Sequence, residues 1–211
     1  MSSPKKVKFV SAQSDTSSEG LGHLQDIDFA SKSCWTDLQL VVEGKNLYVP
    51  KSHLALVSPV FRLMFKSNFK EKDIDVLPLP GKKYEDVLTF LKCTHPGALV
   101  KVTYDIVPKV LPLAHEYQVK WLLDDCTNVM MMEMDASKCL YGVKSDVAQK
   151  YCSICVMAEK YGLSSVINAF IQRLSSFCYR YYKDLIEFKQ VSIEVRYRVL
   201  CGRLDSTDNK L

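Results

Sequence analysis

The side chains best suited to chemistry in this sequence are its eight cysteines and four histidines. Cys152 and Cys155 form a single C-x-x-C pair inside a helical pattern. Structural zinc sites take four ligands, usually supplied by two such pairs, and this chain has no second pair. Cys93-x-His95 lacks two further ligands nearby. We therefore predict no metal site and no cofactor, and we interpret the C-x-x-C thiols as small buried hydrophobic side chains.

Catalytic motifs are also missing from the sequence. His53 opens an apolar helical segment without a plausible nucleophile beside it, which favours a hydrogen-bonded core histidine over a catalytic one. No phosphate-loop, dinucleotide-binding, zinc-protease or nucleophile-elbow pattern occurs. The acidic pair Asp124-Asp125 fits a solvated helix face. We predict a protein that is not an enzyme and works through its surfaces. The alternative hypothesis is a small helical enzyme.

Composition limits the partners that such a surface could meet. The net charge is +4, which gives no electrostatic case for nucleic acid binding. No apolar run reaches the roughly 18 residues needed to span a bilayer, and the N-terminus lacks a signal-peptide core. A chain of 211 residues with 47% hydrophobic residues does not need disulfides. We therefore expect reduced thiols and a cytoplasmic or nuclear location, without a membrane or nucleic acid partner.

The chain divides into three parts. Residues 1–32 are rich in serine and charge, and we predict that they are mostly disordered. Within them, Lys5-Lys6-Val7-Lys8 is either a short nuclear-import signal or a solvated basic tail. The apolar pattern of residues 33–134 predicts strands followed by paired helices, which is an α+β arrangement. The pattern of residues 135–211 predicts helices only.

The α+β part begins with a hairpin. Alternating apolar residues predict a strand from Asp37, a turn at Gly44-Lys45 and a returning strand over residues 46–49. A further strand is expected over residues 74–79. Ser52 and Ser58 are predicted to cap two successive short helices. Further helical patterns lie over residues 84–91, 107–117 and 119–130.

The helical part carries its own start signals and an internal echo. Ser145 and Ser164 are each predicted to cap a helix, and a last helical pattern of Val191, Val195 and Val199 lies around Ser192. Residues 114–122 align with residues 158–166, because alanine, tyrosine and an apolar residue recur at the same offsets. We interpret this echo as the same helix–turn–helix joint used twice in a continuous helical stack.

Several of these segments together resemble the BTB/POZ domain. They include Trp35-Thr-Asp37-Leu-Gln-Leu-Val-Val-Glu-Gly44, then Tyr48-Val-Pro-Lys-Ser-His53-Leu-Ala-Leu-Val-Ser58-Pro-Val-Phe61, and Leu113-Ala-His-Glu-Tyr117-Gln-Val119-Lys-Trp-Leu122. The resemblance covers about residues 33–134 and implies a small β-sheet with paired α-helices. Residues 135–211 resemble the start of a BACK-type helical extension.

The resemblance also implies a function. BTB/POZ proteins commonly homodimerise, and many bind cullin-3 as substrate adaptors of a ubiquitin ligase. Phe69-Lys70-Glu71 is similar to the φ-x-E motif that contacts cullin in such proteins, whereas Asp37, His53, Ser58 and Phe61 match the fold and dimer signature. We expect the partners to be a second copy, cullin-3 and an unknown client. The alternative is a dimeric nuclear or cytoskeletal scaffold, or a transcription-regulator component, without a ubiquitin ligase role.

Overall fold

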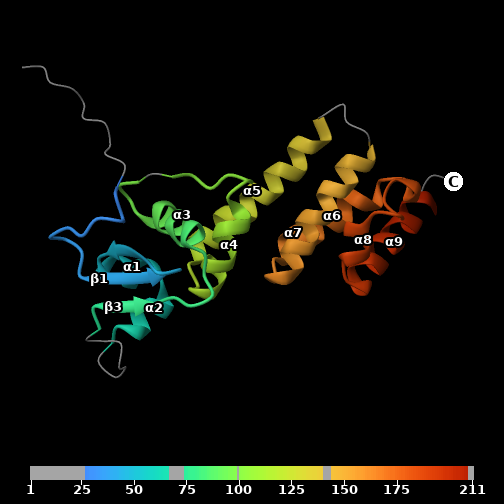
Figure 1. The fold of residues 1–211 in the computed structure, drawn as a ribbon. Helices are drawn as coiled ribbons and strands as arrows, with labels where there is room; N and C mark the ends of the chain where they lie inside the picture. Colours follow the sequence, from blue (N-terminus) through green and yellow to red (C-terminus); the bar gives the residue numbers. More distant parts are fainter. Residues whose placement is uncertain (1–26, 67–73, 99, 140–143, 209–211) are drawn as a thin grey trace, which may run out of the picture.

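The computed structural model describes residues 27–66, 74–98, 100–139 and 144–208. The N-terminal basic cluster, Phe69 and Glu71 therefore lie outside the described residues. Figure 1 shows two lobes, the first with a small sheet and helices α1 to α4, the second with helices α6 to α9. The long helix α5 runs from one lobe to the other (Figure 1). The predicted α+β fold with a helical extension is confirmed.

The sheet of the first lobe has the strand order β2-β1-β3 within the described residues. Its strands are β1 (Leu38–Val42), β2 (Lys45–Val49) and β3 (Val76–Pro78). β1 pairs antiparallel with β2 and parallel with β3. The hairpin turn is formed by Glu43 and Gly44, both with positive φ (49° and 74°), so the predicted turn at Gly44-Lys45 is wrong by one residue.

The turn shifts because Glu43 is held by a distant contact. Its carboxylate Oε2 accepts a hydrogen bond of 2.9 Å from the backbone N–H of Tyr84, the first residue of α3. A carboxylate at a helix N-terminus also meets the positive end of the helix dipole. This contact links the hairpin to α3 and accounts for a left-handed backbone at a residue other than glycine.

The helices of the first lobe and the connecting helix are α1 (Lys51–Val57), α2 (Pro59–Met64), α3 (Tyr84–Thr94), α4 (Val107–Glu116) and α5 (Lys120–Cys139). The second lobe contains α6 (Lys144–Lys160), α7 (Ser164–Ser175), the 3-10 helix η2 (Tyr179–Tyr181), α8 (Ile186–Gln190) and α9 (Ile193–Asp208).

One of the four predicted serine caps is confirmed, because the hydroxyl oxygen of Ser58 accepts from the backbone N–H of Phe61. Ser192 also accepts from the backbone N–H of Val195, a cap that was not predicted. Ser145 lies inside α6, so that prediction is wrong. Ser52 and Ser164 likewise lie inside their helices, so these two predictions are also wrong. The actual N-cap residues there, Pro50 and Leu163, have side chains that cannot accept a hydrogen bond.

The internal echo corresponds to two joints with the same geometry. One residue in each joint has a left-handed backbone, namely Gln118 (φ 52°) between α4 and α5 and Gly162 (φ 67°) between α6 and α7. The N–H of the next residue donates to the carbonyl five residues before it, at 2.9 Å in both joints. This is the Schellman arrangement that ends a helix, and it confirms the repeated joint predicted from the sequence.

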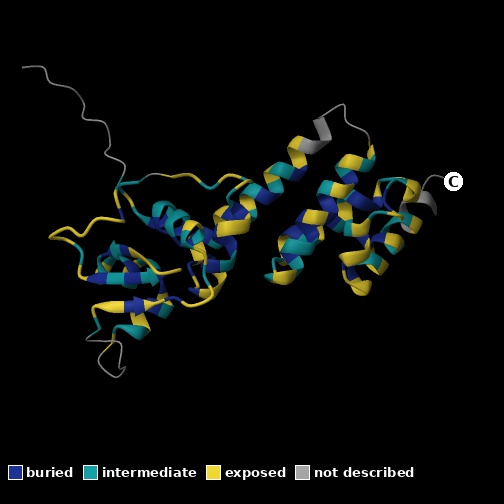
Figure 2. Cartoon of the chain, in the orientation of Figure 1, coloured by how far each residue is buried: buried dark blue, intermediate teal, exposed yellow. Residues whose placement is uncertain are grey.

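The two lobes share one hydrophobic core, which runs from Phe29 to Val199 and appears in dark blue in Figure 2. At the far end of α5, the buried hydroxyl of Tyr151 donates to the carbonyl of Met134 at 2.8 Å. The guanidinium of Arg173 pairs with Asp135 at 2.7 Å. α5 therefore fixes the second lobe to the first. No described helix is both long and apolar enough to cross a membrane.

Candidate interaction surface

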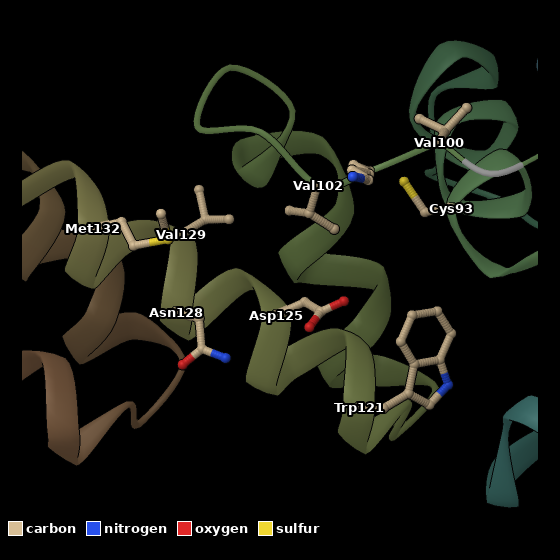
Figure 3. Close-up of a pocket in the computed structure, with 9 residues that line it drawn as sticks. Cys93, Val100, Val102, Trp121, Asp125, Asn128, Val129 and Met132 are labelled. Atoms are coloured by element: carbon tan, nitrogen blue, oxygen red, sulfur yellow. The ribbon is translucent and has the colours of Figure 1, made fainter.

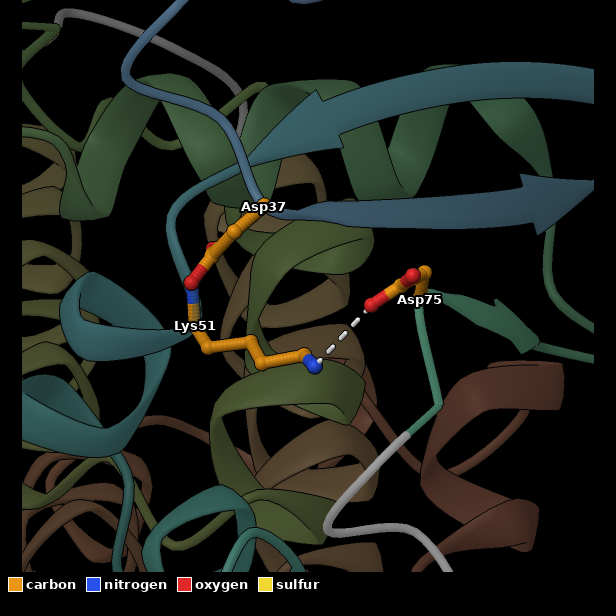
Figure 4. Close-up of polar contacts among 3 residues, drawn as sticks. All are labelled: Asp37, Lys51 and Asp75. Carbon is orange, nitrogen blue, oxygen red and sulfur yellow. Dashed lines mark hydrogen bonds and ion pairs between the residues drawn. The ribbon is translucent and has the colours of Figure 1, made fainter.

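Asp37 connects the start of β1 with the start of α1. Its Oδ1 accepts a hydrogen bond of 2.6 Å from the backbone N–H of Lys51, the first residue of α1 (Figure 4). The Lys51 ammonium reaches Asp75, just before β3, at 3.5 Å. The carboxylate of Asp37 thus satisfies a helix donor that the N-cap residue cannot satisfy. The structure gives this predicted signature residue a structural contact on an exposed edge.

Ser58 and Phe61 lie together at the centre of the first lobe, around Tyr117. The buried Ser58 hydroxyl donates to the backbone carbonyl of Tyr117 at 2.6 Å, in addition to capping α2. The ring of Phe61 stacks on the Tyr117 ring with centroids 4.4 Å apart, and Phe90 packs against the same ring. The α1–α2 pair is thereby locked onto the joint between α4 and α5. Burial raises the pKa of the Tyr117 hydroxyl.

His53 belongs to a second cluster, between α1 and the end of α3. Its Nε2 lies 3.5 Å from the hydroxyl of Thr94, and its ring centroid lies 5.0 Å from that of His95. The ring of Phe29 meets His95 edge-on at 5.7 Å. Burial, and then the charge of His95, lower the pKa of His53; burial also lowers the pKa of His95. Both rings therefore favour the neutral form in the folded chain.

The outer sides of α1 and α2 expose apolar side chains that sequence reasoning missed. Leu56 on α1 is 75% exposed and Leu63 on α2 is 54% exposed. Arg62 holds the two helices together, since its Nε donates to the carbonyl of Ala55 at 2.9 Å. Trp35, before β1, is also exposed. We call Leu56 and Leu63 the α1–α2 surface. In the sequence, Leu56 and Leu63 lie two positions after the buried apolar residues Leu54 and Phe61 of the same helices, so they fall outside the buried side.

A second apolar surface is a groove of about 600 Å³ along α5, shown in Figure 3. Its lining comes from the end of α3, the segment before α4 and one side of α5: Cys93, Val100, Lys101, Val102, Trp121, Asp125, Asn128, Val129 and Met132. Trp121 and Met132 are exposed. Residues 121, 125, 128 and 132 follow helical spacing, which is the signal that could have predicted this face. The single carboxylate from α5, Asp125, gives the groove a polar anchor.

The thiols lie in surroundings that suppress their chemistry. Cys152 and Cys155 are fully buried on α6, as predicted for small hydrophobic side chains. Burial, with a smaller contribution from the charge of Glu187, raises the pKa of Cys152 to about 12. Burial raises the pKa of Cys93 to about 11. Such thiols stay protonated at neutral pH, so they are poor nucleophiles and ligands. Within the described residues, no three His, Cys, Asp or Glu side chains form a group that could hold a metal ion.

Comparison with known proteins identifies the family. The family model of the BTB/POZ domain matches residues 27–132, which is half of the chain. The chain is 31% identical to the BTB and MATH domain-containing protein 38 of Caenorhabditis elegans, over 55% of this chain and 30% of that protein. It is 27% identical to human Kelch-like protein 24, over 58% of this chain and 21% of that protein. The chain therefore belongs to the BTB/POZ family.

The solved BTB (Tramtrack and Bric a brac) domain of human gigaxonin matches 44% of this chain and 75% of its own, with 23% identity and a TM-score of 0.37. The matched part spans less than a third of the length of the two curated relatives named above. Membership in this family defines a protein–protein interaction module, and no catalytic family is indicated.

Proposed function

We propose that this protein is a homodimeric substrate adaptor of a cullin-3 RING ubiquitin ligase. The observation that carries the proposal is the tripeptide Phe69-Lys70-Glu71, which follows the α1–α2 pair of a BTB/POZ domain and precedes β3. This is the place at which the φ-x-E motif of cullin-binding BTB/POZ proteins occurs. A three-residue pattern gains weight from this position.

Each end of the motif has a physical role in the proposed contact. The ring of Phe69 would fill an apolar pocket on a cullin helix and would act as the buried anchor of the interface. The carboxylate of Glu71 would accept a charge-assisted hydrogen bond that fixes the orientation of the partner. The apolar groove of Figure 3 supports the proposal, because the same domain offers a further open surface on α5.

The exposed apolar residues of the first lobe support homodimerisation. Leu56 and Leu63 are large, exposed side chains on two helices that are firmly held to each other. Full burial of one such side chain is worth about 1.5–3 kcal/mol. A closed two-fold dimer is the commonest way in which identical chains cover such a surface.

Copurification with cullin-3 tests the proposal. Phe69→Ala and Glu71→Ala are each expected to weaken cullin-3 binding, and a hot-spot anchor of about 2 kcal/mol corresponds to roughly a 30-fold loss for Phe69→Ala. Lys70→Ala, between them, is the matched control and should bind as the parent does. If a folded double variant of Phe69 and Glu71 retains full cullin-3 binding, this motif plays no part in the contact.

A second candidate function is a dimeric scaffold or transcription-regulator component in the nucleus or on the cytoskeleton. The basic cluster Lys5-Lys6-Val7-Lys8 favours it. Imaging of a fluorescently tagged chain with and without residues 1–32 distinguishes a nuclear from a cytoplasmic role. Proximity labelling in native cells is the measurement that would identify the client protein of the proposed complex.

A further inference from the structure

The groove along α5 exposes large apolar side chains. Trp121 is 42% exposed, Met132 is 70% exposed and Val100 is 36% exposed. Figure 3 places Cys93, Val100 and Trp121 toward one end of the groove and Met132 toward the other. A concave, mainly apolar surface of this kind is typical of a binding site.

The first described residues of the chain are fixed beside the wall of this groove. Ile27 packs against the core, and a Cβ atom added at Gly97 would lie only 2.9 Å from its Cδ1, so this side chain rests against the Gly97 backbone. The buried Phe29 meets His95 edge-on, and its carbonyl accepts from the backbone N–H of Tyr48 at 2.7 Å. Figure 1 shows this blue start of the described chain beside the segment that follows α3. The chain on the N-terminal side of Ile27 is therefore tethered next to the groove.

The lengths of chain on the two sides of this contact match. Leu24 is three residues before Ile27, and Val100 is three residues after Gly97. Three extended residues span at most about 11 Å. Leu24 can therefore reach the end of the groove at which Val100 and Trp121 lie.

Residues 21–26 are also long enough to follow the groove to its other end. Trp121 and Met132 are 11 positions apart on α5, which corresponds to about 16 Å at 1.5 Å per residue. Six extended residues span up to about 20 Å. With Leu24 at Trp121, Leu21 would lie toward Met132.

The residue types of this segment fit an apolar groove. Leu21 and Leu24 are the only large apolar residues among residues 11–26, where polar residues predominate. A tail that serves only as a solvated extension has no need of this pair of leucines. Covering them against exposed apolar side chains of the same chain removes both surfaces from water.

Polar groups of the groove complement the backbone and one charge of the segment. Asp125 and Asn128 lie on α5 between the two ends of the groove. Their carboxylate and amide groups would pair with backbone N–H and C=O groups of an extended peptide. Lys101, in the wall that follows α3, carries the charge opposite to that of Asp26.

The tether favours the chain's own segment over a separate molecule as the occupant. A short flexible linker gives the tethered segment an effective concentration in roughly the millimolar range. A contact built on two leucines would be weak between separate molecules, but it is well populated when both sides belong to one chain.

We propose that residues 21–26 dock in the groove along α5 of their own chain, with Leu24 at Trp121 and Leu21 toward Met132. The proposal goes beyond the adaptor function and does not depend on cullin-3. A partner that binds in the groove would first have to displace this segment, so the segment would act as an internal competitor.

Fluorescence of Trp121 in the full chain tests the contact. The chain has two tryptophans, and Trp35→Phe removes the other one, which is 81% exposed. In that background, Leu21→Asp with Leu24→Asp should shift the Trp121 emission to longer wavelength and raise its quenching by acrylamide, because the indole ring loses its cover.

Matched variants separate apolar docking from a general effect of the N-terminal segment. Ser14→Asp with Ser17→Asp adds the same charges outside residues 21–26 and should change neither the emission nor the quenching. Leu21→Met with Leu24→Met keeps the segment apolar at similar volume and should retain the protected emission. Circular dichroism confirms that each variant is folded.

Crosslinking distinguishes the chain's own segment from that of a second copy. With the exposed Cys34 and Cys178 replaced by serine, Leu24→Cys and Val100→Cys should form a disulfide on mild oxidation. The product should run at the mass of one chain on a non-reducing gel, and mass spectrometry of its peptides identifies the bonded pair. Leu24→Cys with Lys189→Cys is the control, since Lys189 is exposed on α8 in the second lobe and should not crosslink.

Two results would overturn the proposal. The first is that the aspartates at positions 21 and 24 leave the emission and the quenching of Trp121 unchanged. The second is that the disulfide is absent or forms only between two copies, which would assign the groove to another occupant. Neither readout involves cullin-3, so failure here leaves the adaptor function to its own test.

Discussion

Ser58→Ala is expected to be among the most destabilising single-atom changes in the first lobe. The hydroxyl accepts from the N–H of Phe61 at 3.2 Å and donates to the carbonyl of Tyr117 at 2.6 Å, and the residue is fully buried. Loss of a helix cap costs about 0.5–2 kcal/mol. A buried carbonyl left without a donor costs about 1–3 kcal/mol. Together, the free energy of unfolding should fall by roughly 2–4 kcal/mol.

Ser52→Ala provides the control for this prediction. Ser52 also lies near the start of a short helix, but it is exposed and stands inside α1, after the N-cap residue Pro50. Its replacement should change the free energy of unfolding by no more than about 0.5 kcal/mol. Urea unfolding followed by circular dichroism measures both variants. Equal losses for the two serines would refute the argument that Ser58 joins the α1–α2 pair to Tyr117.

Three further measurements follow from the structure. Because the pKa of His53 and of His95 is lowered in the folded chain, unfolding takes up protons at pH values below their ordinary pKa of about 6.5. The contribution of these residues to the free energy of unfolding should be fully present above that pH and should be lost as the pH falls to the folded-state pKa values. His53→Gln should flatten this decline in urea unfolding curves. An unchanged decline would contradict this. Gln118→Gly should raise the free energy of unfolding by about 1 kcal/mol, since the residue has φ 52°; a loss of stability would show that its side chain matters more than its backbone. In Gly202→Ala the new Cβ would lie 2.9 Å from Oγ of Ser175, so the melting temperature should fall, and adding Ser175→Ala should restore part of it; no rescue would contradict this close approach of α9 to α7.

Local patterns predicted the parts of the fold that depend on local chemistry. The hairpin, the Ser58 cap and the repeated joint follow from residue types within a few positions of one another. The turn register and the start of α1 do not, because Glu43 is fixed by Tyr84 and the first donor of α1 is satisfied by Asp37. The parallel pairing of β1 with β3 likewise depends on contacts between distant segments.

The candidate surfaces were harder to predict than the core. Apolar periodicity finds the side of a helix that is buried, as for Val195 and Val199 on α9, but it does not show which other apolar residues stay exposed. Tyr197 and Leu56 become visible as surface residues only when burial is known. Phe69 and Glu71, in contrast, were found from their place in the family pattern, and their contact with cullin-3 stays a prediction.

The most direct test of the adaptor account is the mass of the complex with cullin-3. Light scattering coupled to size-exclusion chromatography would be applied to the full chain mixed with the N-terminal region of cullin-3. The account predicts a complex with two copies of each protein, and Leu56→Glu should reduce it to one copy of each. If the two folded proteins elute separately with their individual masses, the chain is not a cullin-3 adaptor.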